Sequence, residues 1–206
     1  AALTDFQRNV GLDANGICSP ETVATLVRMA SQTGTGPGIA LVREREELSD
    51  STPARTARVV FGAFDTASDL LRATQHRAHE AFPFSTTVEG DVLAQSGAAN
   101  LYNADVYVGF ESSQDDMCTV YFYEVPSFHS VGGKALADRI VATINERIPE
   151  LPARTAGVRH PMLRETRMPA VLCSFGPASI VRLKTVALAN AVVSSLADWL
   201  AAPLES

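Results

Sequence analysis

The pattern of apolar and polar residues along this chain changes near Arg58. Downstream of Arg58, short apolar runs bounded by turn residues alternate with stretches of helical periodicity, which is typical of an α/β layer fold. The nearly all-apolar first run indicates a buried strand in a mostly parallel sheet flanked by helices. The predicted strands are 58–64, 85–89, 105–110, 119–125 and 170–175, and the predicted helices are 68–82 (capped by Ser68), 91–103, 133–148 and 185–200.

Two shorter helices are predicted upstream of the α/β pattern. Ser19 is a good N-cap for the second of them, and Pro20 fits its first helical position. The residues expected to point inward are Leu3, Phe6 and Val10 in the first helix and Val23, Leu26 and Val27 in the second.

The stretch between these two patterns reads as a linker. Glycines and a proline at 34–38 interrupt any helix, and 43–47 is a solvated charge run. We therefore predict three parts: a helical segment at 1–30, a linker at 31–57 and an α/β domain at 58–206.

Composition narrows the classes of function. The 206 residues are 46% hydrophobic and 19% charged, as in an ordinary globular protein. The net charge of -6 argues against nucleic acid and anionic lipid as partners, because those surfaces attract clustered Lys and Arg. No apolar run approaches the roughly 20 residues that span a bilayer, so no membrane span is expected. No leader pattern opens the chain, which favours a cytoplasmic location; a leader removed upstream of Ala1 stays open as the alternative.

Isolated Cys, His and Trp residues have ordinary structural explanations. Cys18, Cys118 and Cys173 form no CxxC pair, and we expect buried free thiols in a reducing compartment, with Cys173 in a strand interior rather than acting as a nucleophile. We expect His76 and His79 to be surface residues and Trp199 to be a core residue. A catalytic triad of Ser174, a His and Asp65 is not expected, because no Gly-x-Ser-x-Gly elbow supports it.

The functional groups of such a sheet gather where its strands end. Four strand exits are predicted to meet there: 62–66, 110–113, 125–127 and 174–177. Their polar content includes Asp65, Glu111 and Ser174.

The N-terminal sequence FQRNVGLDANGICSPETVATL, at 6–26, resembles the second half of the peptidoglycan-binding domain of wall hydrolases. The shared pattern is an aromatic-Gln-Arg helix, a Gly-Leu, an Asn-Gly turn and a Ser-Pro-Glu-Thr helix start. The resemblance implies a partial wall-binding module whose first helix would lie upstream of Ala1.

Two segments of the α/β domain are similar to the zinc N-acetylmuramoyl-L-alanine amidases. ADVYVGFESS, at 104–113, looks like the strand that ends in a zinc-binding His, and LRETRMPAVL, at 163–172, looks like the approach to the catalytic Glu. By this resemblance the first His falls near Asp65, the Glu ligand near Ala67, the second His on Glu111 and the catalytic Glu on Ser174. Zinc hydrolysis needs about three ligands and a general base, and Ser174 cannot act as that base at neutral pH. We expect vestigial positions, with no catalytic residue, bound metal or cofactor.

The sequence looks most like a degenerate actinobacterial branch of this family. That resemblance implies a cytoplasmic regulator of peptidoglycan precursor synthesis that contacts the enolpyruvyl transferase committing UDP-N-acetylglucosamine to the wall pathway. Two alternatives stay open. One is a non-catalytic module that binds peptidoglycan fragments, and the other is an active amidase whose ligands have moved to residues such as His129 and His160.

Overall fold

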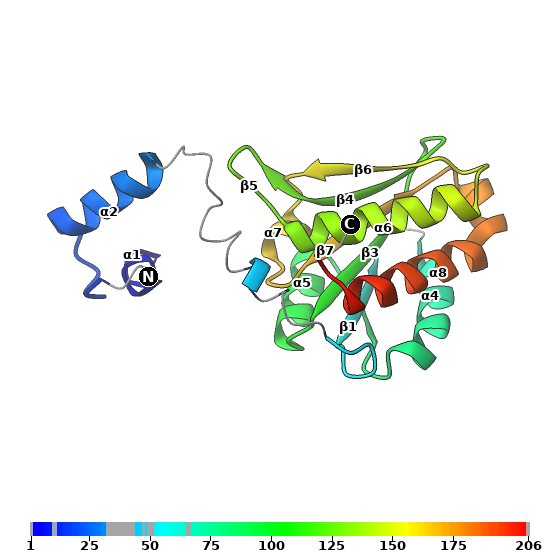
Figure 1. Cartoon of the computed structure of the whole chain (residues 1–206), viewed down its shortest axis with the longest axis horizontal. Coiled ribbons are helices and arrows are strands. Elements are labelled where there is room, and N and C mark those ends of the chain that lie inside the picture. Colours follow the sequence, from blue (N-terminus) through cyan, green and yellow to red (C-terminus); the bar gives the residue numbers. More distant parts are fainter. Residues whose placement is uncertain are drawn as a thin grey trace. The chain divides into compact units, whose positions relative to one another are not determined.

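The computed structural model describes residues 2–9, 12–31, 44–46, 48, 52–64 and 67–204. Its contacts divide the chain into two compact units, Ala1–Pro37 and Gly38–Ser206 (Figure 1). Most of the predicted linker lies outside the described residues, so the three-part division of the chain stays a prediction.

The first unit contains helices α1 (Ala2–Asn9) and α2 (Pro20–Ser31), held together by the buried side chain of Gln7. Its Nε2 donates to the Ile17 carbonyl at 2.8 Å and to Thr22 Oγ1 at 3.1 Å, while the Gly16 N–H donates to its Oε1 at 2.8 Å. Gly16 has φ +74°, the left-handed conformation that favours glycine. One glutamine therefore ties the Asn-Gly turn and the start of α2 to the last turn of α1.

The start of α2 is as predicted, but its buried face is not. The Thr22 N–H donates to Ser19 Oγ at 3.2 Å, which confirms Ser19 as the N-cap. Val23 and Leu26 are 45% and 41% exposed, so the prediction that they point inward is wrong. Thr22 and Thr25 are buried in their place. The hydrogen bond from Gln7 explains the difference, because it turns the threonine face of α2 toward α1. Val10 and the side chain of Val27 lie outside the description.

The second unit is built on a seven-stranded sheet of order β2-β1-β3-β7-β4-β5, with β6 paired to β4. Strands β1, β2, β3 and β7 are mutually parallel, while β4 runs antiparallel to β7 and carries β6 parallel to itself. The predicted α/β class with a mostly parallel sheet is confirmed. The bounds are β1 (Val59–Ala63), β2 (Thr86–Val88), β3 (Val106–Ser112), β4 (Cys118–Val125), β5 (Phe128–His129), β6 (Ala153–Val158) and β7 (Ala170–Phe175).

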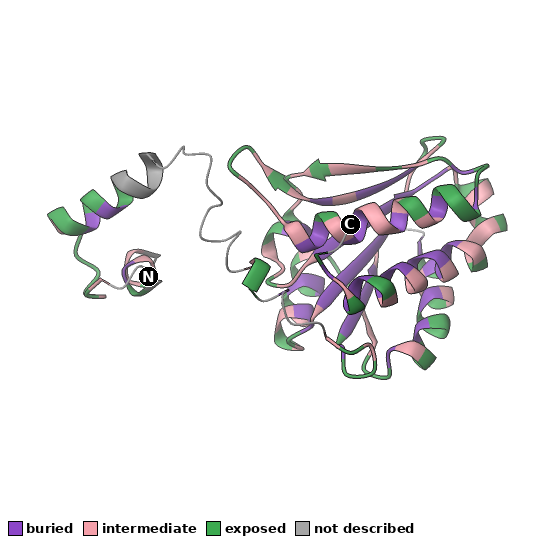
Figure 2. Cartoon of the chain, viewed as in Figure 1, coloured by how far each residue is buried: buried purple, intermediate pink, exposed green. Residues whose placement is uncertain are grey.

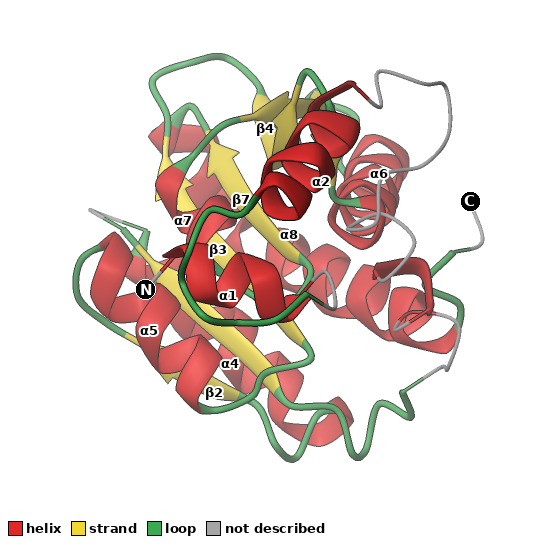
Figure 3. Ribbon diagram, turned by 90° about the vertical axis from the view of Figure 1, so that its left-hand side faces the viewer, coloured by secondary structure: helices red, strands yellow, loops and turns green. Residues whose placement is uncertain are grey.

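Helices cover both faces of the sheet, as Figure 3 shows. One apolar cluster joins the sheet to three helices and includes Phe61, Phe110, Ile140 and Leu196; a smaller one on the other face includes Tyr107, Leu172 and Met162. The buried strands run between these layers (Figure 2). The helices on the larger cluster are α4 (Ser68–Ala81), α6 (Val131–Arg147) and α8 (Ala178–Ala201), and those on the smaller are α5 (Val92–Leu101) and α7 (Pro161–Glu165).

Helix α8 is longer than predicted, and it changes the expectation about membrane spans. Its 24 residues, Ala178–Ala201, are long and apolar enough to cross a bilayer by length and composition. The predicted helix began only at Thr185 and was therefore too short to suggest a span. In the fold, α8 packs against α4 and α6 and buries Leu188, Val192, Leu196 and Trp199, which confirms Trp199 as a core residue. Only 33% of its apolar stretch is buried, and Leu183 and Val186 are 84% and 64% exposed.

Three elements were not predicted. Strand β6 has the sequence ARTAGV, without apolar alternation, and none of its residues is fully buried. Strand β5 and helix α7 are only two and five residues long, too short for periodicity to reveal. Ser68 does not cap α4, because the N-cap position is Ala67 and no side chain caps it.

Candidate functional site

Two of the three predicted site residues meet where the parallel strands end. Glu111 on β3 and Ser174 on β7 are direct register partners. Asp65 lies outside the described residues. The exit at 125–127 does not join them, because β4 runs antiparallel to β7 and ends at the opposite edge of the sheet. The prediction that four strand exits converge was therefore wrong for β4.

Glu111 and Ser174 belong to a row of four polar side chains that crosses four strands. Thr119 on β4 is opposite Ser174, and Arg154 on β6 is opposite Thr119. The Arg154 Nε donates to Thr119 Oγ1 at 3.3 Å. Ser174 and Thr119 are buried, while Arg154 is exposed and Glu111 is half-buried. We call Glu111, Ser174, Thr119 and Arg154 the polar row.

Two members of the polar row, Thr119 and Arg154, were not predicted. Arg154 lies in a strand that shows no strand pattern, and Thr119 gains its place from an antiparallel pairing that periodicity cannot reveal. Strand register would have been the only signal for either residue.

A buried polar pair supports the sheet on the same face as the row. The Tyr107 hydroxyl donates to Gln95 Oε1 at 2.8 Å, and Gln95 Nε2 donates to the carbonyls of Gly90 at 2.8 Å and Ala63 at 3.1 Å. A Cβ at Gly62 would lie 2.3 Å from the Tyr107 hydroxyl oxygen, so glycine is required there. Burial raises the pKa of Tyr107 far above its usual value, which keeps this hydroxyl a hydrogen-bond donor.

The cysteines of the sheet are inert thiols. Cys118 and Cys173 are buried on the face opposite the polar row. Burial raises the pKa of Cys118 to about 12, opposed by a hydrogen bond from the Gly176 backbone. Burial also raises the pKa of Cys173, and electrostatic repulsion from Cys118 and Glu111 raises this pKa further. Both thiols are protonated at neutral pH, and the thiolate is the nucleophilic form. Cys18 is exposed, so the expectation of a buried thiol was wrong there.

The residues described at this edge do not fit a zinc site. In the described part of the chain, no group of three or more His, Cys, Asp or Glu side chains is placed to hold a metal ion. The polar row supplies one carboxylate, two hydroxyls and a guanidinium, whereas zinc sites use imidazole, thiolate or carboxylate groups.

The histidines considered as relocated ligands lie at the far edge. His129 pairs with Glu124, five residues along β4 from Thr119, which is about 16 Å at the usual strand rise. His160 follows β6, which runs parallel to β4, and its Nδ1 accepts the Met162 N–H at 3.2 Å as the N-cap of α7. His76 and His79 are exposed on α4, as predicted. These four side chains have other places in the fold.

Solved structures with a similar fold are N-acetylmuramoyl-L-alanine amidases. The amidase AmiC2 of Nostoc punctiforme aligns with 70% of this chain and 98% of its own, with a TM-score of 0.57 and 16% identity. The catalytic domain of CwlV, from Bacillus (Paenibacillus) polymyxa var. colistinus, aligns with 70% of this chain and 99% of its own, with a TM-score of 0.56 and 16% identity. The fold is that of the N-acetylmuramoyl-L-alanine amidases.

A sequence relative points the same way. The N-acetylmuramoyl-L-alanine amidase CwlM of Mycobacterium tuberculosis is 26% identical over 211 residues, which cover 85% of this chain. The chain spans about half the length of this relative, 51%. No family model matches the chain.

Proposed function

We propose that this chain is a non-hydrolysing amidase-fold protein that regulates peptidoglycan precursor synthesis by contacting another protein. The pairing of Glu111 with Ser174 carries the proposal. By the resemblance to the zinc amidases, these two residues occupy the positions of a zinc-binding His and the catalytic Glu.

The chemistry of the pair explains why hydrolysis is not proposed. A zinc amidase needs a ligand set with an open position for water and a base that takes the water proton. A serine hydroxyl is not a base at neutral pH. Glu111 alone supplies one oxygen ligand group, and His129 and His160 lie at the other edge of the sheet.

The proposed partner is the enolpyruvyl transferase that commits UDP-N-acetylglucosamine to the wall pathway. The support is the likeness to the degenerate actinobacterial branch, and the net charge of -6 is compatible with a protein partner. Since precursor synthesis takes place in the cytoplasm, the proposal includes a cytoplasmic location.

A second candidate is a module that binds peptidoglycan fragments, and the polar row favours it. A carboxylate, two hydroxyls and a guanidinium lie side by side on one face of the sheet. Of these, the Glu111 carboxylate and the exposed Arg154 guanidinium can bind the amines and carboxylates of a muropeptide, whereas the Ser174 and Thr119 hydroxyls are buried. The N-terminal unit, which resembles half of a peptidoglycan-binding domain, adds to this candidate.

Two binding assays on the purified chain separate the candidates. The first mixes it with purified enolpyruvyl transferase and measures complex formation and transferase rate. The second sediments it with insoluble peptidoglycan, alongside the Glu111→Gln, Arg154→Met double variant. If the chain is a regulator, the parent chain and the double variant both form the complex and change the transferase rate equally, and neither sediments with peptidoglycan. Sedimentation that the double variant loses, with no transferase complex, would replace the regulator with the wall-binding module.

A further inference from the structure

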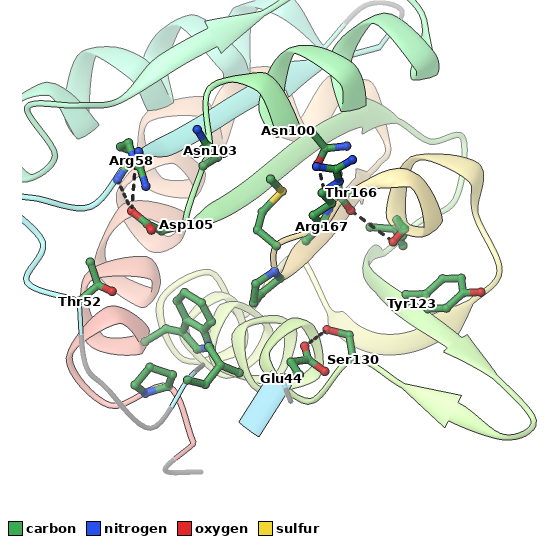
Figure 4. Close-up of a pocket in the computed structure, with 18 of the residues that line it drawn as sticks. Glu44, Thr52, Arg58, Asn100, Asn103, Asp105, Tyr123, Ser130, Thr166 and Arg167 are labelled. Atoms are coloured by element: carbon green, nitrogen blue, oxygen red, sulfur yellow. Dashed lines mark hydrogen bonds and ion pairs between the residues drawn. The ribbon is translucent and has the colours of Figure 1, made fainter. Parts of the chain in front are cut away.

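A cavity of about 930 Å³ opens at the edge of the sheet opposite the polar row. It lies where β1, β3 and β7 begin and where β4 ends, between the end of α5, the loop before β7 and the end of α8 (Figure 4). Small-molecule sites usually enclose about 300–1,000 Å³. The cavity is therefore large enough for an organic ligand, and it is separate from the edge that carries Glu111 and Ser174.

Two of the three arginines that line the cavity are already paired. The Arg58 Nε lies 3.9 Å from Asp105 Oδ2, and its backbone N–H donates to the same oxygen at 2.7 Å. Arg164 pairs with the neighbouring Glu165. The Arg167 guanidinium has no hydrogen bond or ion pair with any described side chain. Its own backbone is fixed, because the Arg167 N–H donates to Asn100 Oδ1 at 2.9 Å.

Asn103 supplies a second uncommitted polar group on the same side of the cavity. Its φ of 51° is the left-handed conformation that closes α5, and its N–H donates to the Asn100 carbonyl at 3.1 Å. The side-chain amide takes no part in this cap, and it has no hydrogen bond within the described residues. Asn103 and Arg167 are thus anchored through their backbones next to Asn100, with their side-chain polar groups available.

The carboxylates of the cavity are engaged, so they leave little attraction for a cation. Glu44 accepts hydrogen bonds from Ser130 Oγ at 2.5 Å, from the Val131 N–H at 2.9 Å and from the Gly132 N–H at 3.2 Å. Asp105 is held by Arg58. Arg167 is thus the one charged side chain of the cavity wall without a partner among the described residues.

The inner wall of the cavity is apolar. It contains Leu163, Met168, Trp199 and Leu200. Trp199 is 1% exposed, and its Nε1–H has no hydrogen-bond partner in the described part of the chain. This N–H is itself buried, so Trp199 contributes apolar surface rather than a donor to the cavity wall.

We propose that this cavity binds a small organic anion, a carboxylate or a phosphate monoester that carries an apolar body. The Arg167 guanidinium pairs with the anionic group through two parallel hydrogen bonds. The Asn103 amide binds a neighbouring oxygen, and the apolar body lies on Leu163 and Met168. The anion-binding proposal goes beyond the proposed regulatory contact and does not depend on it.

Trp199 provides the readout, because it is the single tryptophan of the chain. Its emission is followed during titration with phenylacetate and phenyl phosphate, which distinguish a carboxylate from a phosphate head group. Phenylacetamide and phenethylamine serve as neutral and cationic counterparts, and inorganic phosphate tests the head group without an apolar body. Each titration is repeated with Arg167→Met, Asn103→Gly, which keeps the left-handed backbone, and Arg182→Met, an exposed arginine outside the cavity.

Saturable binding of at least one anionic phenyl probe at millimolar concentration is expected, with inorganic phosphate and the neutral and cationic probes weaker. Loss of a charge-assisted pair should weaken binding roughly ten-fold or more in Arg167→Met, and Asn103→Gly should weaken it less. Arg182→Met should bind like the parent chain. No saturable response to either anionic probe, equal response to the cation, or unchanged binding in Arg167→Met would overturn the proposal.

Discussion

Glu44 stabilises the start of helix α6 through its side chain. Its carboxylate accepts three hydrogen bonds at the start of α6, where backbone N–H groups have no partners within the helix. A carboxylate in this position also interacts favourably with the helix dipole. We expect Glu44→Ala to lower the free energy of unfolding by about 1–2 kcal/mol in urea.

Glu80→Ala is the matched control, because Glu80 is exposed near the end of α4. It should change the free energy of unfolding by less than about 0.5 kcal/mol. Equal effects of the two substitutions would mean that Glu44 does not cap α6 in solution.

The buried thiols and Tyr107 predict a loss of stability at alkaline pH. An ordinary thiol has a pKa of about 8.5 and a phenol about 10. Burial raises the pKa of Cys118 to about 12 and that of Tyr107 well above its usual value. The unfolded chain thus releases these protons at lower pH than the folded chain does. The contribution of these groups to the free energy of unfolding is therefore fully present below about pH 8.5 and falls as the pH rises above it.

Urea unfolding between neutral pH and about pH 10.5 measures this slope. Tyr107→Phe should be less stable at neutral pH, because Gln95 Oε1 loses its donor, but it should lose less stability above about pH 10 than the parent chain. The opposite slope, with stability rising toward alkaline pH, would show that these groups are not buried in their neutral forms.

Two helical glycines test the packing of the elements. A Cβ at Gly132, on α6, would lie 2.7 Å from Leu48 Cδ1 and 2.9 Å from Pro169 Cγ, whereas a Cβ at Gly97, on α5, would meet nothing within 4 Å. We expect Gly132→Ala to destabilise the fold by about 1–3 kcal/mol through overpacking. Gly97→Ala should stabilise it by up to about 1 kcal/mol, because alanine restricts the unfolded chain.

Thermal unfolding of both variants gives the comparison directly. A Gly132→Ala protein as stable as Gly97→Ala would mean that Leu48 does not pack at the start of α6.

The elements that the sequence predicted well are those whose residues are buried on both faces. Strand β7, AVLCSF, has the predicted bounds because an apolar run between turn residues has few other interpretations. Strand β6 was missed because an edge strand needs no apolar alternation. The orientation of β4 could not be read from the sequence, since a parallel and an antiparallel strand carry the same apolar pattern.

The candidate site was predictable to the extent that it rests on parallel strands. Glu111 and Ser174 were expected to lie together because β3 and β7 end at the same edge, and the register confirms it. Thr119 and Arg154 joined them through pairings that no local pattern encodes. The cavity at the other edge could not be predicted either, because its walls come from segments more than one hundred residues apart, which no local pattern brings together.

The two units of the chain should differ in the reactivity of their thiols. Cys18 is exposed in the first unit, while Cys118 and Cys173 are buried in the second. We expect a thiol reagent to modify Cys18 rapidly in the native protein, and the other two cysteines only on unfolding. Mass spectrometry of the digested protein identifies the modified residue. Rapid native modification of Cys173 would contradict the buried, inert thiol described above.

Zinc binding by the purified chain tests most directly whether the amidase fold has lost its hydrolytic site. The chain is equilibrated with zinc, passed through a desalting column, analysed for bound metal, and incubated with peptidoglycan to detect cleavage of the lactyl amide bond. Because the described residues around Glu111 and Ser174 provide no zinc ligand set, and Ser174 stands where the resemblance places the catalytic Glu, we expect less than stoichiometric zinc and no cleavage. One tightly held zinc ion per chain together with cleavage would contradict the proposal and make the protein an active amidase.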